Sequence, residues 1–329
     1  MTENGKMMYV TAGTGFIAAY LIRAILNKDY SVLTTIRNPD NVEKIGYLWD
    51  LPGAKQRLKI LKADLFEEGS FDEAVDGVDG VFHTACPVVI PNDCNIKETF
   101  LDLCVNGTLN VLKSCSRSTS VKRVVLTSSC VSIRYNYNTE ELSPLDESHW
   151  SNPEYCKQYN LWYAYAKTIG EKETWKYAEE QGLDLVVVNP SFVVGPLLAP
   201  EPTSSLALIL SIMKGGNNKT YPDLRLGFVH IDDVIAAHIL AMEVPSASGR
   251  IICSGAVAHW EEIVKMLKEK YPMYPIADQC GRDQGNATPY TMNTAKIKSL
   301  GFGNSKSIEQ MFEDSIRSFQ EKGVLQNLP

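Results

Sequence analysis

Short apolar runs alternate with longer amphipathic stretches over the first half of the chain. The runs at 124–127 and 185–188 are rich in valine and nearly free of polar residues, a pattern typical of strands buried on both faces of a sheet. The longer stretches carry the apolar period of helices. We predict strands at 8–11, 32–36, 58–61, 81–83, 124–127 and 185–188, and helices at 15–27, 41–50, 96–116 and 160–181.

This alternation predicts the α/β fold class, with a Rossmann-type doubly wound parallel sheet whose ligand lies at the carboxyl ends of the strands. After Pro190 the composition changes to Pro, Ser and Leu, and a strand at 226–230 precedes a helix at 232–242. Helical patterns at 260–271, 294–300 and 308–322 complete the chain. We therefore predict a smaller C-terminal lobe that is interleaved with the sheet.

Composition narrows the function class. The chain has 329 residues, 44% of them hydrophobic, which is enough for a large core. Its net charge is -7 and its basic residues are scattered, which argues against binding of nucleic acid or acidic lipid. The eight cysteines show no metal-ligand spacing and are interpreted as reduced packing thiols.

A glycine-bearing turn, Ala12-Gly13-Thr14-Gly15-Phe16-Ile17-Ala18, joins the first predicted strand to the first helix. Small residues let backbone N–H groups approach a pyrophosphate, and the helix N-terminus favours its charge. We expect cofactor contacts from five residues of this turn: Gly13, Thr14, Gly15, Phe16 and Ile17. The alternative, a turn without a ligand, is disfavoured by the strand–turn–helix context.

Ala12 stands where the dinucleotide fingerprint has its first glycine. An alanine in a turn of unusual backbone angles costs about 1 kcal/mol. Either Gly13 relieves this strain by shifting the turn, or cofactor affinity is weakened.

Arg37 follows the second predicted strand, and Lys44 lies further on in the next helix. An NAD-selective protein carries an acidic residue here, so the positive charge favours the 2′-phosphate of NADPH; the alternative is a solvated loop charge. Asp64 and Leu65, after the third strand, are placed to contact the adenine. We assign 1–189 and 226–254 to an NADP-binding Rossmann domain, and 190–225 and 255–329 to the substrate-binding lobe.

Tyr163 and Lys167 form the only Tyr-x-x-x-Lys of the chain and share one face of a predicted helix. A neighbouring cation lowers the pKa of a phenol. Ser129 follows a buried strand at the edge where a nicotinamide would lie, although Thr127 and Ser128 fit the spacing equally well. We predict that Tyr163 donates a proton to a carbonyl, Ser129 orients that carbonyl, and Lys167 lowers the Tyr163 pKa and binds the ribose.

These motifs, in this order, resemble an extended short-chain dehydrogenase/reductase of the plant dihydroflavonol reductase / cinnamoyl-CoA reductase branch. The segments Ser129-Cys-Val-Ser-Ile-Arg134 and Gly227-Phe-Val-His resemble tetraketide α-pyrone reductases in particular. The resemblance implies an NADPH-dependent ketone reductase acting on a polyketide-derived pyrone. Further cofactor residues are then expected at Thr84, Ala85, Pro190, Val193 and Ser205. Substrate residues are expected at Cys86, Pro87, Arg134, Ser191, Phe192 and Gly227.

Two differences from these relatives argue against the reduction of dihydroflavonols and of cinnamoyl-CoA thioesters. Dihydroflavonol reductases resemble one another in an Asn near Arg134 and a Gln near Gly227, and this chain has neither. Cinnamoyl-CoA reductases carry Asn-Trp-Tyr-Cys-Tyr-Gly-Lys around the tyrosine, whereas this chain has Asn160-Leu-Trp-Tyr-Ala-Tyr-Ala-Lys. The alternatives are an aldehyde or cinnamoyl-CoA-type reductase, followed by a dihydroflavonol 4-reductase or a non-catalytic dinucleotide sensor.

The substrate pocket is expected to have apolar walls, formed by Pro190, Ser191, Phe192 and a helix at 206–213, which suit a flat and moderately apolar substrate. Arg134 either binds an enolate-like oxygen or carboxylate at the pocket mouth or is a surface cation. Cys86 lines the pocket or is a small buried thiol. The expected partner is a small carbonyl compound, with no nucleic acid and no membrane, for a cytoplasmic monomer or weak homodimer without a secretory signal.

Overall fold

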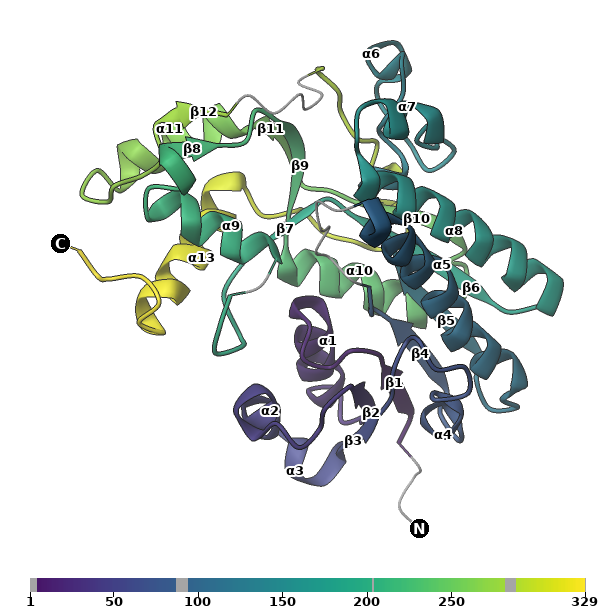
Figure 1. Cartoon of the computed structure of the whole chain (residues 1–329). Helices are drawn as coiled ribbons and strands as arrows, with labels where there is room; N and C mark the ends of the chain where they lie inside the picture. The colour runs from purple at the N-terminus through teal and green to yellow at the C-terminus, as the bar shows by residue number, and fades with distance from the viewer. Residues whose placement is uncertain (1–4, 87–93, 203, 282–287, 329) are drawn as a thin grey trace.

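The computed structural model describes residues 5–86, 94–202, 204–281 and 288–328 (Figure 1). Its centre is a seven-stranded sheet in the order β10-β6-β5-β4-β1-β2-β3, with every neighbouring pair parallel. The strands are β1 (Met7–Val10), β2 (Ser31–Ile36), β3 (Leu58–Lys62), β4 (Gly80–His83), β5 (Arg123–Thr127), β6 (Leu185–Pro190) and β10 (Gly249–Cys253). The prediction of a Rossmann-type α/β fold is confirmed.

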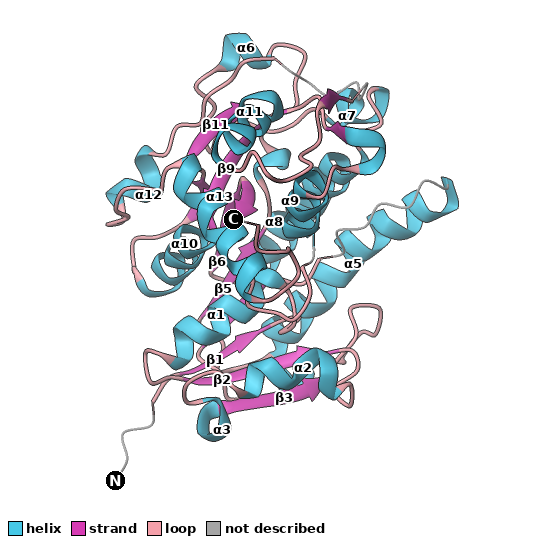
Figure 2. Cartoon of the chain, turned by 90° about the vertical axis from the view of Figure 1, so that its left-hand side faces the viewer, coloured by secondary structure: helices cyan, strands magenta, loops and turns pink. Residues whose placement is uncertain are grey.

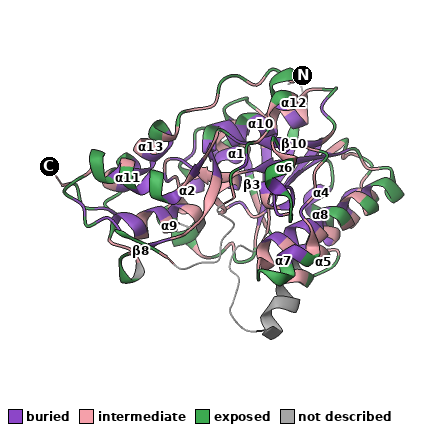
Figure 3. Cartoon of the chain, turned by 90° about the horizontal axis from the view of Figure 1, so that it is seen from above, coloured by how far each residue is buried: buried purple, intermediate pink, exposed green. Residues whose placement is uncertain are grey.

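Helices cover both faces of this sheet (Figure 2). One face packs against α1 (Phe16–Leu26), α2 (Val42–Trp49), α10 (Ile231–Glu243) and α12 (Ala295–Ser299). The other packs against α4 (Asp72–Val75), α5 (Cys94–Arg117) and α8 (Trp162–Gln181). Successive strand residues alternate between the two cores: Val125 joins the first, and Val124 and Leu126 join the second. Both faces are therefore buried, as the valine-rich runs predict (Figure 3).

The seventh strand, β10, lies in the segment 226–254 that was assigned to the large domain, although its own range was not among the predicted strands. Arg250 interrupts its apolar run, and a charged residue inside a short run hides a buried strand from the hydrophobic pattern. In the structure the charge of the buried Arg250 is compensated, because its guanidinium pairs with the buried carboxylate of Glu171 on α8.

The second lobe is built on a three-stranded sheet in the order β11-β9-β7. Its strands are β7 (Phe192–Val194), β9 (Arg225–His230) and β11 (Ala256–His259), and its helices are α9 (Ser204–Met213), α11 (Trp260–Lys270) and α13 (Ile308–Glu321). Its core centres on edge-to-face rings of Phe228 and Trp260, with Phe312 beside them. A separate pair joins β8 (Thr220–Tyr221) to β12 (Gln279–Cys280), and short helices α3 (Ala54–Arg57), α6 (Thr139–Leu142) and α7 (Pro153–Gln158) lie between larger elements.

The chain passes between the two sheets with almost no linker. Ser191 alone separates β6 from β7, α10 begins directly after β9, and Ser254 and Gly255 separate β10 from β11. The predicted division placed β9 with the large sheet; β9 instead pairs with β7 and β11. Only α10 and β10 of that segment belong to the layers of the large sheet.

Candidate active site

The turn between β1 and α1 has the features of an anion cradle. The Gly13 N–H donates to the Thr35 carbonyl at 3.1 Å, and a Cβ on Gly13 would come within 2.4 Å of Thr34 Oγ1, so only glycine fits there. Gly15 precedes α1 without any side-chain cap, and the first turn carries no acidic residue. The N–H groups of Phe16 and Ile17 thus lie in a first helical turn that suits a pyrophosphate.

Ala12 itself carries the unusual backbone conformation of this turn, with φ of 54°. The expectation that Gly13 relieves the strain is wrong, since Gly13 is not among the residues with positive φ. A left-handed alanine costs about 1 kcal/mol relative to glycine.

Arg37 lies exposed just beyond β2, at the same edge as the turn because β1 and β2 are parallel neighbours. Lys44 is exposed in the first turn of α2. Asp64 is half-buried and its Oδ1 accepts the Phe66 N–H at 3.0 Å, while Leu65 packs partly buried against the second core. All four residues lie at or just beyond the carboxyl ends of β2 and β3, where an adenosine moiety is expected.

Thr11, which the sequence did not single out, joins the ends of β1 and β4. Its Oγ1 accepts the N–H groups of Thr84 and Ala85, each at 2.9 Å, and Thr84 Oγ1 donates to the Thr11 carbonyl at 2.6 Å. Because its oxygen already accepts two hydrogen bonds, the Thr11 hydroxyl donates a hydrogen bond to Nδ1 of His83 at 3.0 Å. These bonds fix Thr84 and Ala85 at the point where the strand order reverses, the usual ligand position in such sheets.

The three hydroxyls that spacing alone could not separate have different partners. Thr127 Oγ1 is 2.7 Å from Nε2 of His238, and Ser128 Oγ donates to Glu171 at 2.5 Å. Ser129 is the one that interacts with Tyr163, where its hydrogen bond lowers the pKa of the phenol. Ser129 also begins a 3-10 turn by accepting the Val131 N–H at 3.3 Å, which orients its side chain.

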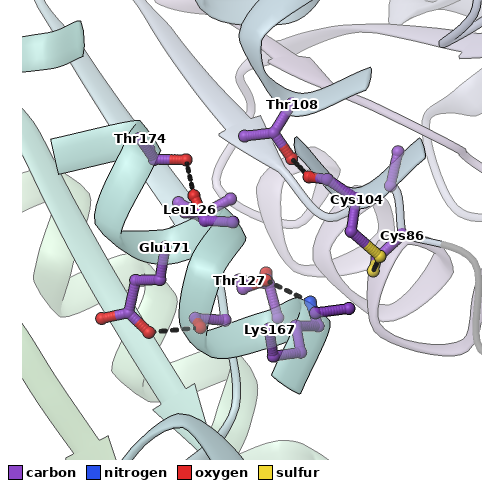
Figure 4. A pocket seen from close by; sticks show the side chains of 12 residues that line it. Cys86, Cys104, Thr108, Leu126, Thr127, Lys167, Glu171 and Thr174 are labelled. Atoms are coloured by element: carbon purple, nitrogen blue, oxygen red, sulfur yellow. Dashed lines mark hydrogen bonds between the residues drawn. The ribbon is translucent and has the colours of Figure 1, made fainter. Parts of the chain in front are cut away.

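Tyr163 and Lys167 lie one turn apart on α8, facing the end of β5. The Lys167 side chain is buried, and its Nζ donates to the Thr127 carbonyl at 3.3 Å (Figure 4). Burial raises the pKa of Tyr163, while Lys167 and Ser129 oppose that rise. The net direction is upward, so in this structure Lys167 moderates the pKa of the phenol without bringing it below the usual value.

Glu171 extends the same face of α8 by another turn and was missed at the sequence level. Its Oε2 accepts hydrogen bonds from Ser128 at 2.5 Å, Ser132 at 2.7 Å and Asn189 at 2.9 Å. Its Oε1 accepts from Nε of Arg250 at 2.6 Å. The spacing Tyr163, Lys167, Glu171 would have indicated this position, because residues four apart stack on one helix face.

Cys86 and Cys104 meet beside Lys167. Their sulfur atoms are 3.7 Å apart, and both side chains line the small pocket that Lys167 and Ala85 also line (Figure 4). Cys86 is half-buried there, and Cys104 is a buried residue of α5. Pro87, also expected near the substrate, lies outside the described residues.

Val193 and Ser205 are in contact, and Pro190 precedes Val193 in the chain by three residues. Pro190 ends β6, Val193 is the central residue of β7, and Ser205 Oγ donates to the Val193 carbonyl at 2.6 Å. The expected helix at 206–213 is the body of α9.

Ser191 and Gly227 meet where the two sheets join. Ser191 Oγ donates to Ser254 Oγ at 2.8 Å, and a Cβ on Gly227 would come within 2.4 Å of Ser191 Oγ. Phe192 packs its ring against Phe228 and Trp260, so it supports the core of the second lobe. A cleft of about 480 Å³ opens beside this junction, lined by Ser254, Gly255, Tyr290 and their neighbours.

Arg134 differs from the expectation of a pocket-mouth or surface cation, because its side chain is only 3% exposed. The guanidinium donates to neutral oxygens, namely the Arg225 carbonyl and the hydroxyls of Tyr290 and Tyr135. It also lies 4.2 Å from the centre of the Tyr135 ring. Stacking and hydrogen bonding offset part of the cost of burying this charge, which neighbours the cleft through Tyr290 and Arg225.

Within the described ranges, no three metal-ligating side chains cluster at a site, and no helix is long and apolar enough to span a bilayer.

The chain is similar to known proteins over most of its length. A family model described as the NAD dependent epimerase/dehydratase family matches residues 8–253. Tetraketide alpha-pyrone reductase 2 of Arabidopsis thaliana is 62% identical over 317 residues, covering 96% of this chain and 98% of the relative. Tetraketide alpha-pyrone reductase 1 of the same plant is 46% identical, covering 98% of this chain and 97% of the relative.

A solved structure shares the fold over the whole length. Vestitone reductase from alfalfa (Medicago sativa) superposes with a TM-score of 0.82 at 35% sequence identity, covering 97% of this chain and 99% of the other. These relatives are reductases, so the prediction of an oxidoreductase is confirmed. The chain belongs to the NAD dependent epimerase/dehydratase family, and within it to the branch of extended plant reductases that includes the tetraketide α-pyrone reductases.

Proposed function

We propose that this protein is an NADPH-dependent ketone reductase of plant specialised metabolism, acting on a polyketide-derived pyrone. The observation that carries the proposal is the convergence of Ser129, Tyr163 and Lys167 at the carboxyl edge of the sheet. Relatives at 62% and 46% identity are named for the reduction of a tetraketide α-pyrone.

The cofactor fits the residues present. The uncapped first turn of α1 and the glycine at position 13 suit a pyrophosphate, and the exposed Arg37 guanidinium at the neighbouring strand end suits a 2′-phosphate. Among the described residues, no acidic side chain forms an ion pair with Arg37. Arg37 itself lies where an NAD-selective protein would have an acidic residue. Bound NADPH supplies the hydride.

The protein's own groups manage the proton. Because burial raises the pKa of Tyr163, the phenol keeps its proton at neutral pH and is ready to donate it to the substrate carbonyl oxygen. Ser129 hydrogen-bonds that oxygen and holds it toward Tyr163. The Lys167 ammonium, held by the Thr127 carbonyl, stabilises the phenolate left behind and would bind the ribose hydroxyls of the cofactor.

The junction of the two sheets supports the proposed substrate class. Gly227 leaves no space for a longer side chain, such as the Gln that dihydroflavonol reductases carry near this position, because Ser191 and Ser254 crowd it. Arg134 has a buried Nε with no hydrogen-bond partner among the described residues. A cation held next to the cleft favours an acidic, enolate-like oxygen, such as the hydroxyl of a hydroxypyrone.

The test measures NADPH oxidation by the purified protein with a panel of hydroxyalkyl-pyrone ketones, flavanones and aldehydes. We expect the pyrone ketones to show the highest kcat/KM. Tyr163→Phe should lower kcat by roughly two to four orders of magnitude while leaving NADPH binding intact. Tyr165→Phe, which changes a neighbouring tyrosine of the same helix, is the matched control and should stay active. Full activity in Tyr163→Phe would refute the mechanism, and preference for aldehydes would refute the substrate class.

A further inference from the structure

The two thiols beside Lys167 are unusual in their proximity. The sulfur atoms of Cys86 and Cys104 lie 3.7 Å apart, although the residues come from different elements, the segment after β4 and helix α5. A disulfide requires the sulfurs to be about 2 Å apart. A movement of less than 2 Å along the line between them would therefore bring the two sulfurs to bonding distance.

The backbone on the Cys104 side is fixed. The Cys104 carbonyl accepts a hydrogen bond from Thr108 Oγ1 at 2.8 Å and faces Gly170 of α8, where a Cβ would come within 3.3 Å of it. This close packing of α5 on α8 leaves little room for Cys104 to shift. Cys86 is half-buried on the wall of the pocket, whose volume of about 20 Å³ admits only a molecule close to the size of water.

We propose that Cys86 and Cys104 form an oxidisable dithiol site whose reactant is hydrogen peroxide. The Cys86 thiolate attacks the peroxide O–O bond and gives a sulfenic acid with release of hydroxide. The Cys104 sulfur then displaces the sulfenic oxygen, which leaves with the Cys104 proton as water. Two thiols are oxidised to one disulfide, and one peroxide is reduced by the same two electrons.

Electrostatics assign the two roles. A hydrogen bond from the Cys104 thiol lowers the pKa of Cys86 to about 6, against the cost of burial and with the help of Lys167. The same hydrogen bond, together with burial, raises the pKa of Cys104. At neutral pH, Cys86 is thus the nucleophilic thiolate and Cys104 the protonated resolving thiol.

Oxidation changes the site that the proposed reductase uses. The disulfide removes the thiolate that faces the Lys167 ammonium and bonds Cys86 to α5. We expect oxidised protein to lose most of its reductase activity. The loss of activity rests on the proposed function, whereas formation of the disulfide does not.

The test exposes the purified protein to hydrogen peroxide at stepwise concentrations and identifies linked peptides by mass spectrometry. The expected product is a Cys86–Cys104 linkage with the mass of two hydrogens lost, together with at least a fivefold (about 1 kcal/mol) loss of kcat/KM that dithiothreitol reverses. In Cys104→Ser, the sulfenic acid at Cys86 should persist and be trapped by dimedone. Cys86→Ser should keep its own untreated activity under the same exposure.

Cys280→Ser is the matched control, because Cys280 is exposed and distant from the site along the chain. This variant should form the disulfide and lose activity as the wild type does. Both thiols remaining alkylatable after exposure, or inactivation of Cys86→Ser to the same extent as the wild type, would overturn the proposal. Formation of the disulfide without any reductase activity before treatment would count against the proposed function alone.

Discussion

Glu171 and Arg250 form a buried ion pair, with Oε1 of the carboxylate 2.6 Å from Nε of the guanidinium and both side chains nearly inaccessible. The pair joins α8 to β10 across 79 positions of the chain. Through Ser128 and Ser132, the same carboxylate holds the residues on either side of the segment that contains Ser129. It therefore ties the fold of the sheet to the position of the candidate catalytic serine.

Replacing Glu171 by glutamine should be strongly destabilising. The variant keeps the shape of the side chain and leaves Arg250 buried without its counter-charge, which costs about 3–5 kcal/mol of unfolding free energy. Denaturant unfolding monitored by circular dichroism measures the change. Glu179→Gln, an exposed position near the end of the same helix, is the control and should differ from wild type by less than about 0.5 kcal/mol. A loss below about 1 kcal/mol in Glu171→Gln would show that the pair is not important for stability.

Arg37→Ala should change cofactor selectivity without changing stability. The side chain is exposed at the end of β2, so its loss removes a contact to the 2′-phosphate and little else. A charge-assisted hydrogen bond is worth about 1.5–3 kcal/mol, so we expect the dissociation constant for NADPH to rise roughly tenfold or more. Fluorescence titration with NADPH and NADH gives both constants. Equal weakening of the two cofactors would argue that Arg37 does not contact the 2′-phosphate.

Ala12→Gly should tighten cofactor binding. Ala12 holds φ of 54° in the pyrophosphate turn, and glycine adopts this conformation at no steric cost. We expect the dissociation constant for NADPH to fall by up to about fivefold, the equivalent of about 1 kcal/mol. Unfolding free energy should change little, because glycine also gains freedom in the unfolded chain. Ala12→Val, with a β-branched side chain at positive φ, is the opposing variant and should weaken both properties; unchanged affinity in the glycine variant would discard the hypothesis.

Acid should destabilise the protein through its buried histidines. Burial lowers the pKa of His238 to about 4 and that of His83 to about 3. Between these values and the usual pKa of about 6.5, the unfolded chain binds protons that the folded protein does not, so stability falls as pH falls. Each histidine should remove roughly 2 kcal/mol of unfolding free energy between about pH 8 and pH 5.

His238→Gln isolates one of these contributions. The amide can still bond Thr127 and the Val234 carbonyl, the two partners of the imidazole. Unfolding free energy measured over the same pH interval should then fall less steeply than in wild type. His149→Gln, at a partly exposed position, is the control. A slope identical to that of wild type in His238→Gln would contradict the assignment.

The architecture and most of the candidate cofactor site could be predicted from the sequence, because those features depend on residues that are close together in the chain. Short apolar runs predicted six of the seven strands of the sheet within one or two residues at their ends, and the glycine turn and the Tyr163–Lys167 pair depend on neighbours in the chain. The strand that escaped prediction, β10, carries Arg250, whose charge is acceptable only because of a residue on another helix.

Features that depend on partners far apart in the chain could not be predicted from the sequence. Thr127, Ser128 and Ser129 are equivalent by spacing and become distinct only through His238, Glu171 and Tyr163. Arginine usually lies at the protein surface, yet the Arg134 guanidinium lies against the rings of Tyr135 and Tyr290. The contact between Cys86 and Cys104 requires knowing how α5 packs on α8.

Two of the crossings between the sheets are bonded to each other. Ser191 Oγ donates to Ser254 Oγ at 2.8 Å, and the Ser191 N–H donates to the Cys253 carbonyl at 3.0 Å. A ketone bound beside this junction would lie where the chain holds the two sheets together. If the outer parts of the two lobes moved, these bonds would keep the distance from the ketone to Ser129 and Tyr163 nearly constant.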